Sequence, residues 1–323
     1  MRAPQSGPAE TRALYEAALD MARWADERGG VQIVLSEHHA SPDGYLPAPL
    51  VLASAIAART RRIPIQVAAL ILPLHDPVAL AEHMAVLDIL SGGRVSYVTA
   101  VGYRPEEYAM FGRDFASRGR RMEDCLRALR DAWTGEPFAF EGRPARVTPI
   151  PATPGGPTLF MGGNSAVAAR RAARFGMGLL SQGLHPGLGE IYAEECRRLG
   201  REPGPCINPP QDLVTSAFIS EDPDRSWREI GPHLLHDARS YAAWMGDSNE
   251  SVSRSRATTV QELRDQSGPY RIFTPGEAIE HLRRAGLMLF QPLCGGIPPQ
   301  LAWASLDLFA REVLPAVAPD GGT

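Results

Sequence analysis

Apolar and polar positions along the chain alternate between the two spacings that characterise helices and strands. Residues 9–27 carry Leu14, Ala18 and Met21 at helical spacing between charged residues, which predicts an amphipathic helix. Two glycines end that pattern, and the mostly apolar run at 31–35 that follows predicts a buried strand. The chain therefore enters its fold through a helix that leads into a strand.

The same alternation of helix and strand repeats to the end of the chain. Repeated units of this kind favour an α/β fold with a parallel sheet and helices outside it. Closure into a TIM (β/α)8-type barrel is the version we favour, with residues 1–323 forming a single domain. Further strands are expected at 63–72, 94–99, 158–161, 178–181, 213–219 and 287–293. Further helices are expected at 49–59, 77–90, 166–174, 189–199, 226–244, 275–285 and 301–313, with another ending near Trp133.

The strand count falls one short of the eight that a complete barrel needs. The missing strand is the first, because residues 1–8 are too few and too rich in proline and glycine for a buried strand. We therefore expect a barrel whose first strand is missing or atypical. The polar segment 246–270 is expected to be a mobile lid insertion, the alternative being an ordinary surface loop.

Composition limits the class of protein. The 323 residues are 44% hydrophobic and 22% charged, with a formal net charge of −4, so no basic surface argues for a nucleic-acid partner. The four cysteines are far apart and form no CxxC pair, which favours reduced thiols. The sequence has neither a signal-peptide core nor an apolar run that could span a membrane. We expect a soluble cytoplasmic enzyme with no membrane partner.

The triplet Glu37-His38-His39 is the strongest chemical signal, since it follows the first expected strand directly. Active sites of α/β barrels lie where strands end, so the triplet is a candidate catalytic site. A satisfied polar cluster under a loop is the plainer alternative. A metal site is disfavoured, because successive strand residues point to opposite faces and no third ligand cluster is evident. We expect no metal.

A second signal is the turn Gly162-Gly163-Asn164-Ser165 between an expected strand and helix. Glycines let the backbone approach a ligand, and a helix N-terminus favours an anion such as phosphate. Glycine and serine also begin many helices that bind nothing, so this turn by itself is weak evidence.

Two more strand exits contain small residues. Ala68-Ala69 leaves room for a flat ligand against the backbone, although the pair can equally be a packing choice. The strand at 94–99 ends in Ala100-Val101-Gly102-Tyr103, where Gly102 again allows close approach. The more specific interpretation of the small residues at these strand exits is a binding site for a planar cofactor.

Taken in order, these segments resemble the bacterial luciferase-like flavin-dependent monooxygenases, from about Leu14 to about Pro315. No single segment is unique, but their joint order is specific. The residues that carry the resemblance are Leu35-Ser36-Glu37-His38-His39, Ile71-Leu72-Pro73-Leu74-His75-Asp76-Pro77, Leu87-Asp88-Ile89-Leu90-Ser91-Gly92-Gly93-Arg94, Gly112 with Arg120-Arg121, and Cys294-Gly295-Gly296-Ile297-Pro298-Pro299.

The resemblance implies a role for each candidate. His38 would be the catalytic histidine, supported by Glu37 and His39. The pair Ala68-Ala69, whose peptide is often cis in the family, would prop the flavin ring from behind. Ala100, Gly102 and Tyr103 would line the same cofactor cavity, and the turn of Gly162, Gly163, Asn164 and Ser165 would hold the phosphate end. Two positions depart from the luciferase catalytic chain, because Val101 and Ala168 stand where that chain has an arginine and a threonine.

The implied activity is oxidation of a small organic substrate with O2 and reduced FMN, through a flavin hydroperoxide. The implied partners are a small-molecule substrate, a separate flavin reductase and a second copy in a homodimer. Two alternatives stay open at this point. One is a deazaflavin (F420)-dependent reductase or dehydrogenase, and the other is a non-catalytic luciferase-like partner subunit.

Overall fold

The fold was obtained as a computed structural model, which describes residues 2–4, 6–210, 212–245, 251, 253–266 and 268–317. Internal contacts divide the chain into two compact units. Unit 1 comprises residues 1–17, 182–184 and 209–323, and unit 2 comprises residues 18–181 and 185–208. Each is considered by itself.

Unit 2 is built on a six-stranded parallel sheet in the order β1-β2-β3-β6-β7-β8. Each strand pairs with the next, for example Leu35 with Val67 and Tyr97 with Leu159. Because every pair is parallel, the carboxyl ends of all six strands lie at one edge. The strands are β1 (Ile33–Leu35), β2 (Ile65–Ile71), β3 (Val95–Ala100), β6 (Leu159–Gly162), β7 (Gly178–Leu180) and β8 (Cys206–Ile207).

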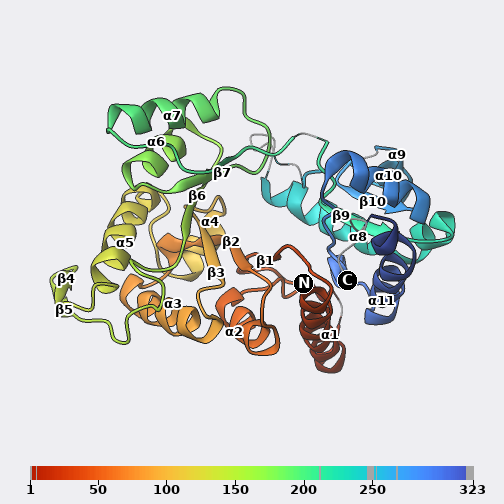
Figure 1. Cartoon of the computed structure of the whole chain (residues 1–323), viewed down its shortest axis with the longest axis horizontal. Helices are drawn as coiled ribbons and strands as arrows, with labels where there is room; N and C mark the ends of the chain where they lie inside the picture. Colours follow the sequence, from red (N-terminus) through yellow and green to blue (C-terminus); the bar gives the residue numbers. More distant parts are fainter. Residues whose placement is uncertain are drawn as a thin grey trace. The chain divides into compact units, whose positions relative to one another are not determined.

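Helices α2, α3 and α5 pack along one side of this sheet, and α6 packs against α7 (Figure 1). The sequence explains the limits of α3 in particular. The Asp76 carboxylate accepts from the amides of Val78 and Ala79, and Gly92 ends the helix at a φ of 66°. The helices that contribute to this unit are α1 (Pro8–Glu27, which begins in unit 1), α2 (Pro49–Arg59), α3 (Pro77–Ser91), α4 (Pro105–Met110), α5 (Arg118–Ala132), α6 (Ala166–Arg174) and α7 (Leu188–Arg198).

The core of unit 2 lies between the sheet and these helices. Ile65, Val67 and Leu70 of β2 are fully buried, as is Met84 of α3. Burying a side chain of this size contributes about 1.5–3 kcal/mol. A short hairpin of β4 (Phe138–Phe140) and β5 (Arg143–Ala145) precedes β6.

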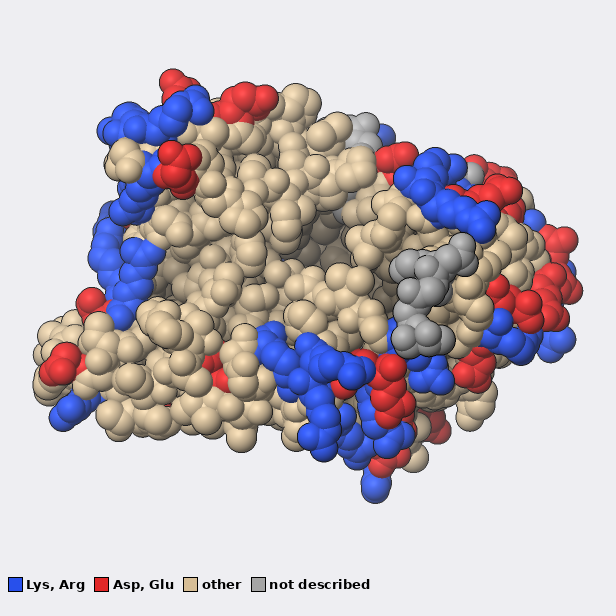
Figure 2. All heavy atoms as spheres, in the orientation of Figure 1, with Lys and Arg blue, Asp and Glu red and all other residues tan. Residues whose placement is uncertain are grey.

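The surface of unit 2 is basic at some of its elements and apolar at others. The chain has no lysine, so every basic side chain is an arginine. Figure 2 shows a band of basic residues along the edge that α5, α6 and α7 form. The exposed arginines on these helices are Arg120, Arg127, Arg130, Arg170, Arg174, Arg197 and Arg198. Beside the end strand β1, Val31 and Val34 are 73% and 55% exposed, so an apolar surface stays open there.

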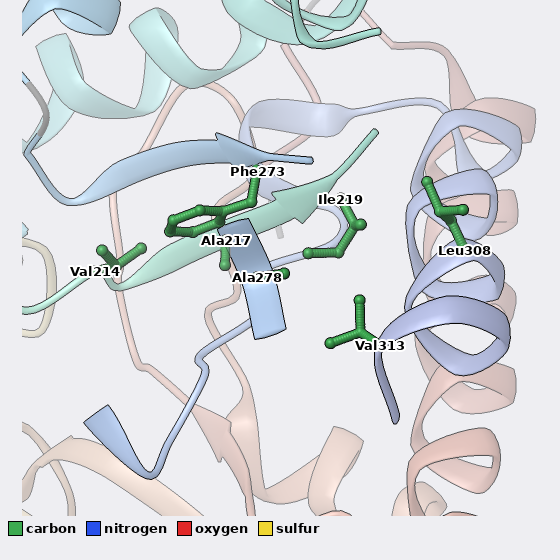
Figure 3. Close-up of a cluster of buried hydrophobic side chains, with 7 residues drawn as sticks. All are labelled: Val214, Ala217, Ile219, Phe273, Ala278, Leu308 and Val313. Atoms are coloured by element: carbon green, nitrogen blue, oxygen red, sulfur yellow. The ribbon is translucent and has the colours of Figure 1, made fainter. Parts of the chain in front are cut away.

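Unit 1 contains a two-stranded parallel sheet of β9 (Ser216–Ile219) and β10 (Tyr270–Phe273). Figure 3 shows its core, in which side chains of β9 and β10 meet those of the surrounding helices. The helices of this unit are α8 (Pro223–Met245), α9 (Val260–Asp265), α10 (Pro275–Ala285), η2 (Cys294–Gly296), α11 (Pro299–Leu308), η3 (Phe309–Val313) and α12 (Leu314–Val317). The core side chains are Val214, Ala217, Ile219, Phe273, Ala278, Leu308 and Val313.

The α/β class with parallel strands is confirmed, and so is the missing first strand, because residues 2–4, 6 and 7 contain none before α1. The strand expected at 287–293 is wrong, since only Phe290 forms an isolated bridge, to Ala217. Strands β8 and β10 were not predicted. The single domain over 1–323 and the lid at 246–270 stay predictions. Within that insertion, residues 246–250, 252 and 267 lie outside the described residues, and its described part contains α9.

Candidate active site

The predicted site residues of unit 2 lie at the carboxyl edge of the six-stranded sheet. The triplet Glu37-His38-His39 follows β1, whereas Ala68 and Ala69 lie within β2. Ala100, Gly102 and Tyr103 are at or just past the end of β3, and Gly162 is the last residue of β6. Because β1, β2, β3 and β6 are consecutive neighbours, the triplet and the diglycine turn are about 14 Å apart across the sheet at ordinary strand spacing.

Most of these residues keep part of their surface accessible. Ala68 and Ala69 are the only residues of β2 that are not buried, and Ala100, Gly102 and Tyr103 are partly exposed as well. Gly162, Gly163 and Asn164 share this partial exposure. Adjacent strand ends therefore present a continuous accessible surface of small residues, which a flat ligand can contact.

Glu37 is the centre of a buried hydrogen-bond network. Its side chain is fully buried, and one carboxylate oxygen lies 3.0 Å from Nε2 of His39 and 2.8 Å from Nε2 of His75. The other oxygen accepts from the amide of Ile71 at 2.5 Å. These three contacts connect the end of β1 with the end of β2 and the turn after it.

The network keeps the Glu37 carboxylate ionised. Burial alone would raise its pKa, but the hydrogen bonds from His39 and His75, the charge of His75 and the Ile71 amide together lower the pKa to about 2. An ionised carboxylate can only accept, so both Nε2 atoms must carry the proton. Glu37 therefore fixes the orientation of both imidazole rings, because each Nε2 atom donates to its carboxylate.

His38 packs against an aromatic side chain. Its ring stacks on Tyr45, with ring centroids 4.6 Å apart and planes 10° from parallel. The Ser36 hydroxyl donates to the phenol oxygen of Tyr45 at 3.2 Å. His38 is 9% exposed, so it sits at the boundary between the interior and the accessible surface.

The peptide between Ala68 and Ala69 is cis, as the resemblance implies. The pairing of β2 with β3 shifts register between Ala68 and Leu70. Ala69 and Ala100 both pack against the buried cluster of Ile71, Leu74 and Tyr108. The structure therefore brings the predicted ring-contact residues of β2 and β3 together.

The diglycine turn is closely packed. A methyl group on Gly163 would come within 2.7 Å of the Ala168 methyl, and one on Gly162 within 3.0 Å of Val98 and 3.4 Å of Ala100. Ser165 caps α6 by accepting from the Ala168 amide at 3.2 Å, whereas the Gly163 amide donates to Leu180 at 3.1 Å. Any anion at this turn would therefore meet the first amides of α6 and not the Gly163 amide.

Sequence reasoning missed Arg104 and Glu107, a buried pair that contacts the main chain of His39. The sequence offered one signal for this pair: an arginine and a glutamate three residues apart, shortly after the small residues at the end of β3. A further polar group follows β7 and β8, where the Asn208 side chain accepts from the Ser181 hydroxyl at 2.8 Å and from the His185 amide at 3.0 Å.

The described residues contain no cluster of three or more metal-ligating side chains. Across the same part of the chain, no helix combines the length and the apolar character that crossing a bilayer requires.

The four cysteines form no disulfide bonds with one another. They are Cys125, Cys196, Cys206 and Cys294.

Comparison with known proteins identifies a family and relatives that are similar to this chain in sequence. The model of the luciferase-like monooxygenase family matches residues 2–285. The 4-hydroxyprotoasukamycin monooxygenase of Streptomyces nodosus subsp. asukaensis is 31% identical over 52% of this chain and 47% of its own length. The alkanal monooxygenase beta chain of Photorhabdus luminescens is 28% identical over 50% and 51%. The chain thus spans about half the length of these curated relatives.

Solved structures show the same fold at low sequence identity. Monooxygenase RslO1 from Streptomyces bottropensis has a TM-score of 0.73 at 22% identity, over 98% of both chains. The oxygenating constituent of 3,6-diketocamphane monooxygenase from Pseudomonas putida, solved with FMN, has a TM-score of 0.69 at 19% identity, over 97% and 95%. An F420-dependent secondary alcohol dehydrogenase scores 0.66 at 16% identity, over 94% and 95%.

The family model covers most of the chain, and the structural likeness extends over nearly all of it. Both agree with the parallel α/β fold. The chain belongs to the luciferase-like monooxygenase family.

Proposed function

We propose that this protein is a flavin-dependent monooxygenase that uses reduced FMN and O2 to oxidise a small organic substrate. The observation that carries the proposal is the position of His38 and the Gly162-Gly163 turn at one edge of a single sheet. The accessible small residues of β2 and β3 lie between them. A tricyclic ring with a phosphorylated tail has the shape and length that this surface accommodates.

Each strand end would hold a different part of the flavin. The first turn of α6, with Asn164 and Ser165, would bind the phosphate, since the helix dipole favours negative charge there. Ala68 and Ala69 would support the ring from behind, and Ala100, Gly102 and Tyr103 would line its side. Without the arginine and threonine of the luciferase catalytic chain, phosphate binding would depend more heavily on main-chain amides.

The flavin would supply two electrons, so that one atom of O2 enters the substrate and the other leaves as water. The protein's part is to orient the reactants, to exclude water and to move protons. His38 is our candidate for the proton transfer, because imidazole exchanges protons near neutral pH. Glu37 and His39 would fix the main chain and the ring orientations around it.

The partners that we propose follow from the same chemistry. A separate reductase would deliver reduced flavin, consistent with the FMN-bound relative being the oxygenating constituent of its monooxygenase. A second copy of the chain would cover the exposed apolar side chains Val86, Ile89 and Leu90 of α3 and Val51 of the adjacent α2. Unpaired cysteines are consistent with a cytoplasmic location.

Two other functions have a specific observation in their favour. The F420-dependent dehydrogenase shares the fold over most of this chain, which supports a deazaflavin-dependent hydride transfer. The alkanal monooxygenase beta chain is a relative by sequence, which supports a non-catalytic partner role. We rank both below the monooxygenase, because the Glu37-His38-His39 triplet and the phosphate turn are both present.

The test is to offer reduced FMN and reduced deazaflavin in parallel to the purified chain, and to record the spectrum and mass of what stays bound. We expect FMN to bind and O2 to be consumed. The His38→Ala variant should keep FMN, release hydrogen peroxide and form oxidised product more slowly than the wild type. Anaerobic turnover with deazaflavin, or no binding of either cofactor, would refute the proposal in favour of one alternative or the other.

A further inference from the structure

Arg104 and Glu107 form a buried ion pair that the proposed chemistry does not use. They are 6% and 2% exposed, and the Arg104 guanidinium lies 3.1 Å from the Glu107 carboxylate at the start of α4. Burying two charges is costly unless each is paired and hydrogen-bonded. A pair in this position therefore needs a reason beyond stability.

The pair holds the main chain of His39 from both sides. The Arg104 guanidinium donates to the His39 carbonyl at 2.7 Å, and the Glu107 carboxylate accepts from the His39 amide at 2.9 Å. The next residue, Ala40, has a φ of 51°, in the left-handed region that alanine rarely adopts. Such a conformation persists only where the surroundings fix it, and Arg104 binds the carbonyl that directly precedes it.

The loop that carries this pair also lies beside the proposed flavin site. Arg104 follows Gly102 and Tyr103, and the Tyr108 hydroxyl donates to the Val101 carbonyl at 2.6 Å. A methyl group on Gly102 would come within 2.8 Å of Ile71, so the loop packs closely on that residue. Since the Ile71 amide binds Glu37, the same loop also reaches the Glu37 network that holds the His39 ring.

We propose that Arg104 and Glu107 are positioning residues, which transmit the position of the Gly102-Tyr103 loop to the main chain of His39 and so to the ring of His38. A ligand that moves the loop would thereby move the histidines, although the two loops follow strands separated by β2. The identity of that ligand rests on the proposed function. The contacts of Arg104 and Glu107 with His39 are independent of the proposed function.

The first test needs no cofactor. Hydrogen exchange at the His39 amide, measured by NMR, should be at least tenfold faster in Glu107→Ala than in the wild type. Glu107→Gln keeps an acceptor oxygen and a similar shape, so it should restore most of the protection, and it guards against a variant that fails to fold. Glu106→Ala, at an exposed position of the same helix, is the matched control and should leave the rate unchanged. Equal exchange in the Glu107→Ala and wild-type proteins would overturn the proposal.

The second test asks whether the pair acts through the histidine. Glu107→Ala should slow product formation by tenfold or more in the wild-type background but by less than twofold when His38→Ala is already present. A purely structural role predicts the same fold-loss in both backgrounds, and that result would overturn the proposal. A wild-type chain that binds no flavin would refute the proposed function instead, and the exchange measurement would still decide whether Glu107 holds His39.

Discussion

The His38 imidazole lies flat against the Tyr45 phenol, with ring centroids 4.6 Å apart and planes 10° from parallel. Tyr45 is 4% exposed, so the stack forms one wall of the site from within the interior. A stacked imidazole keeps little rotational freedom. The contact therefore fixes the plane of the ring, and with it the directions in which the His38 nitrogens can exchange a proton.

Tyr45→Ala should therefore disorder His38 as well as open a cavity. We expect about 3–5 kcal/mol of lost stability and at least a tenfold loss of turnover. Tyr45→Phe keeps the stack and loses the hydrogen bond from Ser36, for which we expect about 1 kcal/mol of lost stability and less than a threefold loss of turnover. Urea unfolding and steady-state kinetics measure the two effects. Equal turnover in both variants would show that the stack of His38 on Tyr45 does not contribute to catalysis.

Gly163 and Ala168 give a second prediction, because a methyl group on Gly163 would meet the Ala168 methyl at 2.7 Å. Gly163→Ala should displace the start of α6 and weaken FMN binding by about tenfold, or roughly 1.4 kcal/mol. Removing the opposing methyl in the double variant Gly163→Ala with Ala168→Gly should recover part of the affinity, because the φ of 154° at Gly163 still strains an alanine. Fluorescence titration measures binding, and Ala168→Gly alone is the control. Absence of any recovery would show that the packing contact is not the cause.

Much of the fold was predictable because its local signals agree with its tertiary contacts. The helices expected at 49–59, 166–174 and 275–285 have those limits in the structure, and each begins at a proline or directly after a capping side chain. The strand expected at 287–293 failed, because an apolar run does not reveal whether a neighbour will pair along its whole length. Strand β8 has two residues, too few for any periodicity.

The candidate site was predictable in its residues but not in its connections. Small residues and histidines at strand ends can be recognised from sequence, whereas the contact of Glu37 with His75 depends on the register of β1 against β2. The contact of Glu107 with His39 depends on two loops that follow strands separated by a third. Neither can be read from local spacing.

The exposed apolar side chains on α3 predict how two copies would associate. Leu90 is 63% exposed and Val86 43%, on the outer side of the helix. Leu90→Glu should weaken a homodimer at least tenfold, because a buried carboxylate would lack a partner there. Light scattering after size-exclusion chromatography measures the mass. Leu287→Glu, which changes another exposed leucine, should leave it unchanged. A monomeric wild type would refute the homodimer.

The Glu37 network predicts a particular dependence of stability on pH. The pKa of Glu37 is lowered to about 2 in the folded chain, because the contacts with His39, His75 and Ile71 outweigh burial. A lowered pKa adds stability above the unfolded value near 4.3, and that contribution is lost as the pH falls toward 2. It amounts to about 3 kcal/mol near neutral pH, of which about half remains at pH 3.

Glu37→Gln removes the titrating group and keeps its shape. We therefore expect the variant to be less stable than the wild type by about 3 kcal/mol at pH 6, and by about half as much at pH 3, because the wild type has then lost part of its advantage. Urea unfolding at both pH values measures the difference, and Glu106→Gln, at an exposed position, should show none. A difference that stays constant between pH 6 and pH 3 would mean that the contacts with His39, His75 and Ile71 do not lower the pKa of Glu37.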